Sequence, residues 1–365
     1  MNSVLTKGTV LGGLTLGEPL GQGGFGITYL ARDNKSGTKF ALKEYFPSDY
    51  ATRLPNGSVS SQSDTKKLFD YGRTSFIDEA NTLKTLPRQK GLVRVRGAFE
   101  RNGTAYCVME YIEGDPLDKM IPRLIQQYGG VPQNIIEQFL DPVSWALAAI
   151  HAKKLIHRDV KPGNIMIRRN GEPVLIDFGA ARVYGRRSNA AVMFTRKYAP
   201  IEQFPPDDSG QIRSLREGPW SDLFSLSVML YEMVSRRVPP DAQTRMNTLK
   251  QTGKDPYVPI EVCLEEKGGS RTPYSPQLLH LIDYGCALMP RDRPRNAMSY
   301  RALLIDDDKL PERDENARRS ASIADNANFR TNGRLSDRTR GRIVMAFIIM
   351  AIAVVAGSYG LWGAF

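Results

Sequence analysis

Two polar clusters set between apolar segments constrain this chain more than any other feature of its sequence. The first runs from Leu155 to Asn164 (LIHRDVKPGN), and the second, Asp177–Gly179 (DFG), begins thirteen residues later. Apolar, strand-like runs flank the first cluster and lead into the second, so we expect both on neighbouring loops of a small sheet. A carboxylate can accept a hydroxyl proton, a lysine can neutralise a phosphoryl group, and Asn with Asp can bind Mg²⁺ through oxygen. The pattern favours phosphoryl-transfer chemistry over two ordinary polar turns.

A glycine-rich segment near the start of the chain fits the same chemistry. Gly21, Gly23 and Gly26 follow an apolar run and precede ITYLARD. Glycines at this spacing let backbone amides approach a phosphate, although the motif alone is weak and also occurs in dinucleotide folds, where it opens a helix. Here a β-favouring segment follows, and 34–37 (NKSG) predicts a turn into a strand at 38–43. We therefore expect the glycines to join two strands of a hairpin.

That next strand ends on Lys43, which could reach phosphates beneath the glycine-rich turn or simply be a solvated strand end. If Lys43 reaches the phosphates, a carboxylate is needed to hold its side chain in place. The helix predicted over 75–86 offers Glu79, one turn before Leu83 on an apolar stripe.

Together these motifs resemble the eukaryotic-like (Hanks-type) Ser/Thr protein kinases, and most closely the bacterial membrane-tethered members. The resemblance implies an α+β fold of two lobes, a small β-rich N-lobe at about 14–113 and a larger helical C-lobe at about 114–305. It implies ATP as the phosphoryl donor, Mg²⁺ or Mn²⁺ as the cofactor and protein hydroxyls as acceptors. HRDVKPGN marks the Ser/Thr class because tyrosine kinases usually carry Ala-Ala-Arg or Arg-Ala-Ala at the Lys161 position, and small-molecule kinases usually show HGD.

The resemblance also assigns roles to individual residues. Asp159 would be the catalytic base, Lys161 would steady the γ-phosphate, and Lys43 would contact the α- and β-phosphates and pair with Glu79. The remaining assignments are the phosphate-covering Gly21, Gly23 and Gly26, the gatekeeper Met109, the adenine-pairing hinge from Glu110 to Ile112, and the metal ligands Asn164 and Asp177.

Further matches concern the architecture of the larger lobe. Thr195 matches the substrate-platform threonine, Asp222 the aspartate that braces the catalytic loop, and Arg293 the arginine that pairs with the activation-segment glutamate, here Glu202. Arg158 matches the arginine that often pairs with a phosphate on the activation segment. Ser188 and Thr195 are candidate phosphosites there, with Thr195 equally interpretable as a platform residue only.

The chain also departs from the family pattern. Ala-Pro-Glu is replaced by Pro-Ile-Glu at 200–202, and Thr28 stands where a valine normally packs on adenine. The segments between Lys43 and Glu79 and between Glu202 and Asp222 are unusually long, and the first is predicted to hold a loop or small hairpin. None of these changes removes a catalytic group.

The carboxy-terminal part predicts a membrane anchor. Residues 343–365 carry no charged side chain and would span roughly 34 Å as a helix at 1.5 Å per residue, enough to cross a bilayer core. A buried core helix or a poorly ordered apolar tail would have a similar sequence. Four arginines lie just before this segment, at 334, 338, 340 and 342. The positive-inside rule therefore places the kinase domain in the cytoplasm, on a single-pass plasma (inner) membrane protein that contacts lipid through 343–365. Gly357, Gly360 and Gly363 would let such helices pack as a homodimer, or merely add flexibility.

Composition limits the other possibilities. The chain is 41% hydrophobic and 24% charged, as in ordinary globular proteins, and its three separated cysteines make neither a disulfide framework nor a zinc knuckle. Of the net charge of +11, four units lie in 309–342, and no basic run with interleaved aromatics stands out before this segment, so we expect no nucleic-acid partner.

Residues 306–342 are polar and Arg-rich, which predicts a flexible juxtamembrane linker, and 1–13 form an N-terminal extension.

Three functions remain open. An active membrane-tethered Ser/Thr kinase acting on protein substrates is favoured because every catalytic group is present. A pseudokinase or scaffold that only binds other proteins is the alternative, and a lipid kinase is a weaker third.

Overall fold

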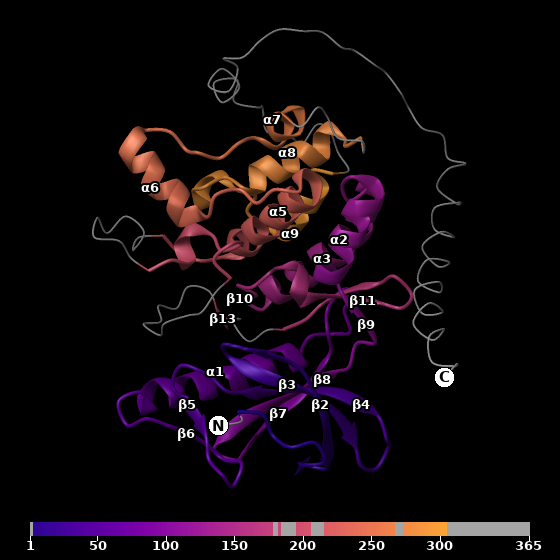
Figure 1. Ribbon diagram of the computed structural model, residues 1–365, viewed down its shortest axis with the longest axis vertical. Helices are drawn as coiled ribbons and strands as arrows, with labels where there is room; N and C mark the ends of the chain where they lie inside the picture. Colours follow the sequence, from indigo (N-terminus) through magenta and orange to yellow (C-terminus); the bar gives the residue numbers. More distant parts are fainter. Residues whose placement is uncertain (1–2, 178–181, 184–194, 206–214, 267–272, 305–365) are drawn as a thin grey trace, which may run out of the picture.

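The chain folds into two lobes joined by a short connection, as Figure 1 shows with the N-terminal lobe below and the helical lobe above. This computed structural model describes residues 3–177, 182–183, 195–205, 215–266 and 273–304. The linker predicted at 306–342 and the membrane helix predicted at 343–365 lie outside the described residues. Among the described residues, no helix combines the length and apolarity needed to cross a bilayer.

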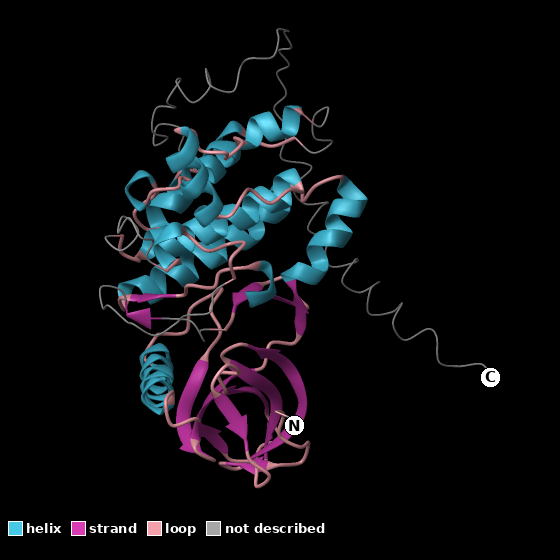
Figure 2. Ribbon diagram, turned by 60° about the vertical axis from the view of Figure 1, so that its left-hand side comes forward, coloured by secondary structure: helices cyan, strands magenta, loops and turns pink. Residues whose placement is uncertain are grey.

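The smaller lobe is a curled antiparallel sheet with one long helix beside it (Figure 2). Its strand order is β1-β2-β3-β4-β8-β7. The strands are β1 (Val10–Leu11), β2 (Leu14–Gly23), β3 (Gly26–Asp33), β4 (Lys39–Tyr45), β7 (Val95–Arg101) and β8 (Thr104–Glu110), and the helix is α1 (Lys66–Lys84). The extension predicted for 1–13 thus packs on this lobe: β1 pairs with β2, and Leu5 and Leu11 are buried.

Helix α1 begins nine residues before the start predicted from sequence, at Lys66 instead of Ser75. Its first turns contain Gly72, a weak helix former, which hides the helical pattern. Packing explains that glycine, since a Cβ there would lie 2.1 Å from the hydroxyl of Tyr45 on β4. Tyr45 also packs against Phe69 and Phe76 of α1, so the helix is held against the strand that carries Lys43.

The long segment between β4 and α1 contains the hairpin expected from its prolines and its Asn-Gly pair. Strands β5 (Ala51–Arg53) and β6 (Val59–Ser61) pair antiparallel around a turn at 54–58. The backbone N–H of Val59 donates to the carbonyl of Asn102 in the β7–β8 turn over 2.7 Å. The hairpin is therefore part of the smaller lobe.

The larger lobe is mainly helical, and two small sheets support its loops. The helices are α2 (Leu117–Tyr128), α3 (Gln133–Ala152), α5 (Pro219–Ser235), α6 (Ala242–Thr252), α7 (Ile260–Glu265), α8 (Pro276–Gly285) and α9 (Ala297–Ala302). One sheet has the order β12-β11-β9, from β9 (Gly114–Pro116), β11 (Ile165–Arg168) and β12 (Pro173–Leu175). The other pairs β10 (Leu155–Ile156) with β13 (Arg182–Val183).

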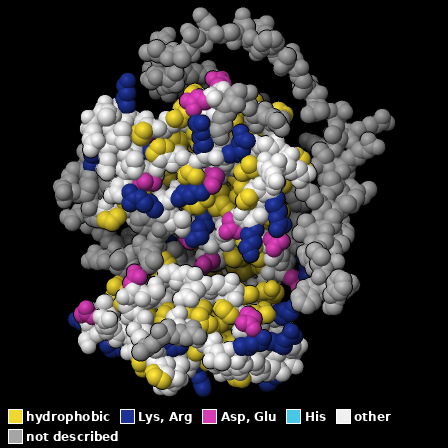
Figure 3. Space-filling view, viewed as in Figure 1, with side chains coloured by type: hydrophobic (Ala, Val, Ile, Leu, Met, Phe, Trp, Pro, Cys, Tyr) yellow, Lys and Arg dark blue, Asp and Glu magenta, His cyan; other side chains and the backbone are white. Residues whose placement is uncertain are grey.

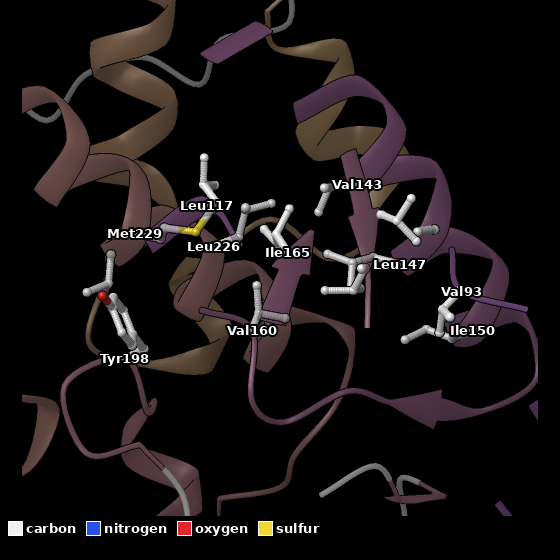
Figure 4. Packing of buried hydrophobic residues seen from close by; sticks show 14 of the residues in the cluster. Val93, Leu117, Val143, Leu147, Ile150, Val160, Ile165, Tyr198, Leu226 and Met229 are labelled. Atoms are coloured by element: carbon white, nitrogen blue, oxygen red, sulfur yellow. The ribbon is translucent and has the colours of Figure 1, made fainter. Parts of the chain in front are cut away.

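The core of this lobe anchors the loop predicted to carry the chemistry. Val160 and Ile165, which lie on either side of Lys161 and Asn164, are fully buried. Figure 4 shows both of them among Leu147, Leu226 and other apolar residues of the surrounding helices. The polar residues between them are therefore held by well-packed neighbours, and the two-lobed α+β architecture predicted from the sequence is confirmed.

Candidate active site

A cleft of about 640 Å³ lies between the lobes and gathers the motifs singled out in the sequence. From the smaller lobe it is lined by the glycine-rich turn, by Lys43 and by Met109. From the larger lobe it is lined by Asp159, Lys161, Asn164 and Asp177, among other residues. Residues more than 150 positions apart in the chain thus face one space.

The glycine-rich turn joins β2 to β3, as expected from the strand-like residues on both sides. Added Cβ atoms at Gly21 and Gly23 would meet no protein atom within 4 Å, so packing does not require glycine at either position. A Cβ at Gly26 would lie 2.1 Å from the carbonyl oxygen of Glu44, so only glycine lets β3 approach β4 this closely. The first two glycines therefore leave space in the cleft, and the third holds the hairpin against the Lys43 strand.

Lys43 projects from β4 into the cleft, with only 7% of its side chain exposed, and its ammonium forms an ion pair with Asp177. Glu79 lies on α1, and its charge acts on the buried Cys107 thiol together with those of Lys43 and Asp177. Burial, opposed by Lys43, raises the pKa of that thiol to about 12. The structure brings all three predicted residues together and pairs Lys43 with Asp177; the Lys43–Glu79 pair stays a prediction.

The connection between the lobes follows β8 and carries the predicted hinge. Met109 and Ile112 are 7% and 6% exposed, and both line the cleft with Glu110. The Glu110 carboxylate accepts a 2.8 Å bond from the Arg168 guanidinium on β11. The hinge is thus tied by its side chain to the larger lobe.

A compact group of polar side chains surrounds Asp159. The Thr195 hydroxyl donates to Asp159 over 2.7 Å and accepts from the Lys161 ammonium over 2.9 Å. Lys161 also lies 2.6 Å from the second Asp159 oxygen, to which the Asn164 amide nitrogen donates over 2.9 Å. The predicted base is therefore fixed in position by three neighbours, and Thr195 contacts it directly.

Two backbone conformations in this region are unusual for residues with side chains. Arg158 and Asp177 have φ angles of 68° and 63°, in the left-handed region. Asp222 holds the first of them, accepting 2.8 Å bonds from the backbone N–H groups of His157 and Arg158. Such conformations persist only where surrounding contacts over-determine them.

Asp222 is fully buried at the start of α5, as its predicted bracing role requires. Burial alone would raise the pKa of its carboxyl, but a bond to His151, the nearby imidazoles and the backbone donors outweigh that effect and hold the pKa below the ordinary 3.8. The predicted Glu202–Arg293 ion pair is also present, at 2.7 Å between fully buried side chains. The Asp222 hydrogen bonds and the Glu202–Arg293 ion pair hold together the segments around the loop, and neither of them faces the cleft.

The pairing of Arg158 with a phosphate stays a prediction. In this structure its guanidinium makes two bonds to the Glu217 carboxylate, of 2.5 and 2.8 Å. The candidate phosphosite Ser188 lies outside the described residues. Sequence reasoning did not find Glu217, and no residue-type signal distinguishes it from the chain's other 38 carboxylates.

The residues present fit a Mg²⁺ ion held mainly by phosphate and water. Among the described residues, no group of three or more His, Cys, Asp or Glu side chains forms a metal cluster. Asn164 uses its amide nitrogen toward Asp159, which leaves its oxygen as the end suited to a cation. One carboxylate and one amide oxygen suit Mg²⁺, which prefers few protein ligands beside substrate phosphates.

Lysines and arginines on the face shown in Figure 3 are interspersed with acidic side chains across the helical lobe. This is the usual pattern of a solvated surface.

Comparisons with known proteins agree with this geometry. The family model described as "Protein kinase domain" matches residues 14–302. The chain is 30% identical over 239 residues to serine/threonine-protein kinase PknA of Nostoc sp., covering 62% of this chain and 38% of that protein. It is 30% identical over 264 residues to serine/threonine-protein kinase PknA of Mycobacterium tuberculosis, covering 69% of this chain and 53% of that one. The matched region thus spans about half of these relatives or less.

A solved structure entitled "PpkA-294 apo form" superposes with a TM-score of 0.66 at 29% identity. The match covers 83% of this chain and 100% of that one.

Proposed function

Because the chain belongs to the protein kinase domain family, in its eukaryotic-like Ser/Thr class, we propose that it transfers the γ-phosphoryl group of ATP to Ser or Thr hydroxyls of proteins. The observation that carries this proposal is the hydrogen-bonded group of Asp159, Lys161 and Thr195 at the cleft, facing the Lys43–Asp177 pair. It supports the proposal because two carboxylates and two cations line one space.

Each residue has a task that its surroundings support. The glycine-rich turn covers the phosphates, while Met109 and the hinge bound the adenine side of the cleft. Lys43, almost fully buried, neutralises phosphate charge from the smaller lobe. Asp159 accepts the proton of the attacking hydroxyl, and Lys161 neutralises the phosphoryl group in transfer.

Asn164 and Asp177 would hold Mg²⁺, which when bound neutralises charge on the transferring phosphate. The Thr195 hydroxyl donates to the Asp159 carboxylate, which keeps the base aimed at one position. Such fixed geometry lowers the entropic part of the barrier.

The test is Mg·ATP-dependent phosphorylation of a generic basic protein by the full-length chain, with identification of the modified residues. We expect phosphate on Ser and Thr, and a loss of about 10²–10⁴-fold in kcat for Asp159→Asn with ATP binding retained. Asp64→Asn, at an exposed carboxylate before α1, is the matched control and should keep wild-type kcat.

Two outcomes would contradict the proposal. Equal activity of wild type and Asp159→Asn would mean that this aspartate is not the base. ATP binding without phosphate transfer by the wild type would favour the pseudokinase or scaffold instead.

We further propose that 343–365 anchors the kinase in a membrane, with the kinase domain in the cytoplasm. The support is the uncharged length of this segment and the four arginines that precede it. Ile349→Arg with Val354→Arg should reduce retention in vesicles of anionic lipid after carbonate washing, because each central arginine costs about 2.5–3.5 kcal/mol in insertion. Unchanged retention of the double variant would contradict the anchor.

A further inference from the structure

Arg158, immediately before the proposed base, is held in a conformation that needs external support. Its φ angle of 68° is left-handed, and its side chain is only 3% exposed. A buried guanidinium without a counter-charge is costly, and so is the backbone geometry. Whatever holds Arg158 therefore also holds the start of the loop that carries Asp159.

Both supports come from the beginning of one helix. Asp222, in the first turn of α5, accepts from the Arg158 backbone N–H over 2.8 Å. Glu217, two residues before α5, accepts from the Nε and Nη2 atoms of the same residue over 2.5 and 2.8 Å. Two carboxylates five positions apart thus hold the main chain and the side chain of a single arginine.

The segment that carries Glu217 is itself fixed. The Trp220 indole donates to the Arg216 carbonyl over 3.1 Å, and Ser221 bonds to both the Gly218 N–H and the Glu202 carboxylate. Glu217 lies between these contacts, with 24% of its side chain exposed. It is therefore presented to Arg158 by a stretch of backbone that is already ordered.

Three other cations of the catalytic loop and of the described part of the activation segment pair with carboxylates. The pairs are Lys161 with Asp159, Arg196 with Asp241, and Lys197 with Glu232. A phosphate on the activation segment carries a charge of about −1.5 to −2, and to bind the Nε and Nη2 atoms of Arg158 as a bidentate partner it would have to displace Glu217.

We infer that Glu217 is a positioning residue for the catalytic loop, and that it permanently supplies the negative charge that a phosphate would otherwise bring to Arg158. The kinase then needs no phosphate on its activation segment to be active. This inference rests on the proposed kinase function and gives a role to the long segment between Glu202 and Asp222.

The experiment compares full-length wild type, Glu217→Gln and Glu217→Asp, each treated with phosphatase until intact mass shows no phosphate. Initial rates are then measured before new phosphate accumulates. Wild type should keep its kcat within about twofold of the untreated enzyme. Glu217→Gln should lose about 10–100-fold in kcat, because small displacements of catalytic groups cost this much, while its KM for ATP stays within about threefold. Glu217→Asp should recover part of the loss.

Asp255→Asn is the matched control, because the chain contains a second buried arginine held in the same way. Arg245 bonds to both Asp255 oxygens over 2.9 and 2.6 Å, with side-chain exposures of 2% and 30%. This variant should lose thermal stability much as Glu217→Gln does and yet keep its kcat. The contrast separates positioning of the loop from general loss of stability.

Three results would overturn the inference. The first is a Glu217→Gln kcat within twofold of wild type, and the second is an equal loss in Asp255→Asn. The third is a wild type that phosphatase inactivates and that recovers as phosphate returns to the activation segment. A wild type inactive in every state, with Asp159→Asn equally silent, would refute the kinase function itself, which distinguishes the two failures.

Discussion

A buried ion pair behind the Lys43 strand gives the sharpest test of how the smaller lobe is held together. Glu44 follows Lys43 on β4, and because strand side chains alternate, it points to the opposite face of the sheet. Its side chain is fully buried and pairs with Arg53 of the hairpin, over 3.0 and 2.5 Å. The hydroxyls of Tyr29 and Tyr106 donate to the same carboxylate.

Arg53 carries this network to the beginning of the chain. Its Nε atom donates to the Ser3 carbonyl over 2.6 Å, and Nη1 donates to the Gly57 carbonyl over 3.0 Å. Ser3 in turn accepts from the side chain of Gln22, inside the glycine-rich turn, over 3.0 Å. One guanidinium therefore joins the N-terminal segment, the hairpin and the Lys43 strand.

Replacing Arg53 with methionine removes the counter-charge of a carboxylate that has no access to water. Removing one partner of a buried ion pair typically costs about 3–5 kcal/mol. At roughly 2–3 °C per kcal/mol for a domain of this size, we expect the unfolding midpoint to fall by about 6–15 °C. Glu44→Gln with Arg53→Met should recover a substantial part of this loss, because no buried charge is then left unpaired.

Thermal and urea unfolding of the four members of this double-mutant cycle provide the assay. Lys7→Met is the matched control, because Lys7 pairs with Glu18 over a similar 2.7 Å but both side chains are about two-thirds exposed, at 69% and 68%. Screened surface pairs contribute little, so its midpoint should stay at the wild-type value. An Arg53→Met midpoint within about 2 °C of wild type, or strictly additive effects in the cycle, would refute this account of the pair.

Three further predictions concern the cleft and its supports. Lys43→Met should weaken binding of a fluorescent ATP analogue by about 10–100-fold, because a charge-assisted bond contributes about 1.5–3 kcal/mol, and unchanged binding would place the phosphates elsewhere. Thr195→Val should lower kcat about tenfold while Thr195→Ser keeps it, measured as initial rates, since only the hydroxyl bonds to Asp159 and Lys161. Asp222 has a lowered pKa in the folded state, so its stabilising effect is complete above the ordinary 3.8 and is lost as pH falls through the lower value. Asp222→Asn should lack this acid-dependent part in urea titrations between about pH 2 and 5, and an unchanged pH profile would contradict it.

The sequence predicted those parts of the site that depend on local spacing. The glycine hairpin, the Lys43 strand, the Asp159 loop and the position of Asp177 after β12 follow from short motifs between apolar runs. Each such motif sits at the end of an element whose burial pattern is legible in a few residues. The sequence did not predict the hydrogen bond between Thr195 and Asp159; the family resemblance indicated only a platform role for Thr195.

Other features depend on partners that are distant in sequence and ordinary in type. Arg158 and Glu217 are 59 positions apart, and nothing near Glu217 indicates a buried arginine across the lobe. Gly72 hid the early start of α1 from the sequence analysis. A glycine is needed at this position because Tyr45 of β4 packs against it. The Arg158–Glu217 pair and the start of α1 both depend on packing between distant segments, which cannot be predicted from a single sequence.

The two unusually long segments have a common physical role. Arg53 of the hairpin at 51–61 pairs with Glu44, which directly follows Lys43. Glu217 of the segment before α5 pairs with Arg158, which directly precedes Asp159. Neither Arg53 nor Glu217 lines the cleft. Because neighbouring residues share one backbone, fixing Glu44 or Arg158 limits the freedom of the catalytic residue beside it. Additions that never touch the substrate can therefore set the geometry of the site, and their removal should appear in kcat rather than in the binding of ATP.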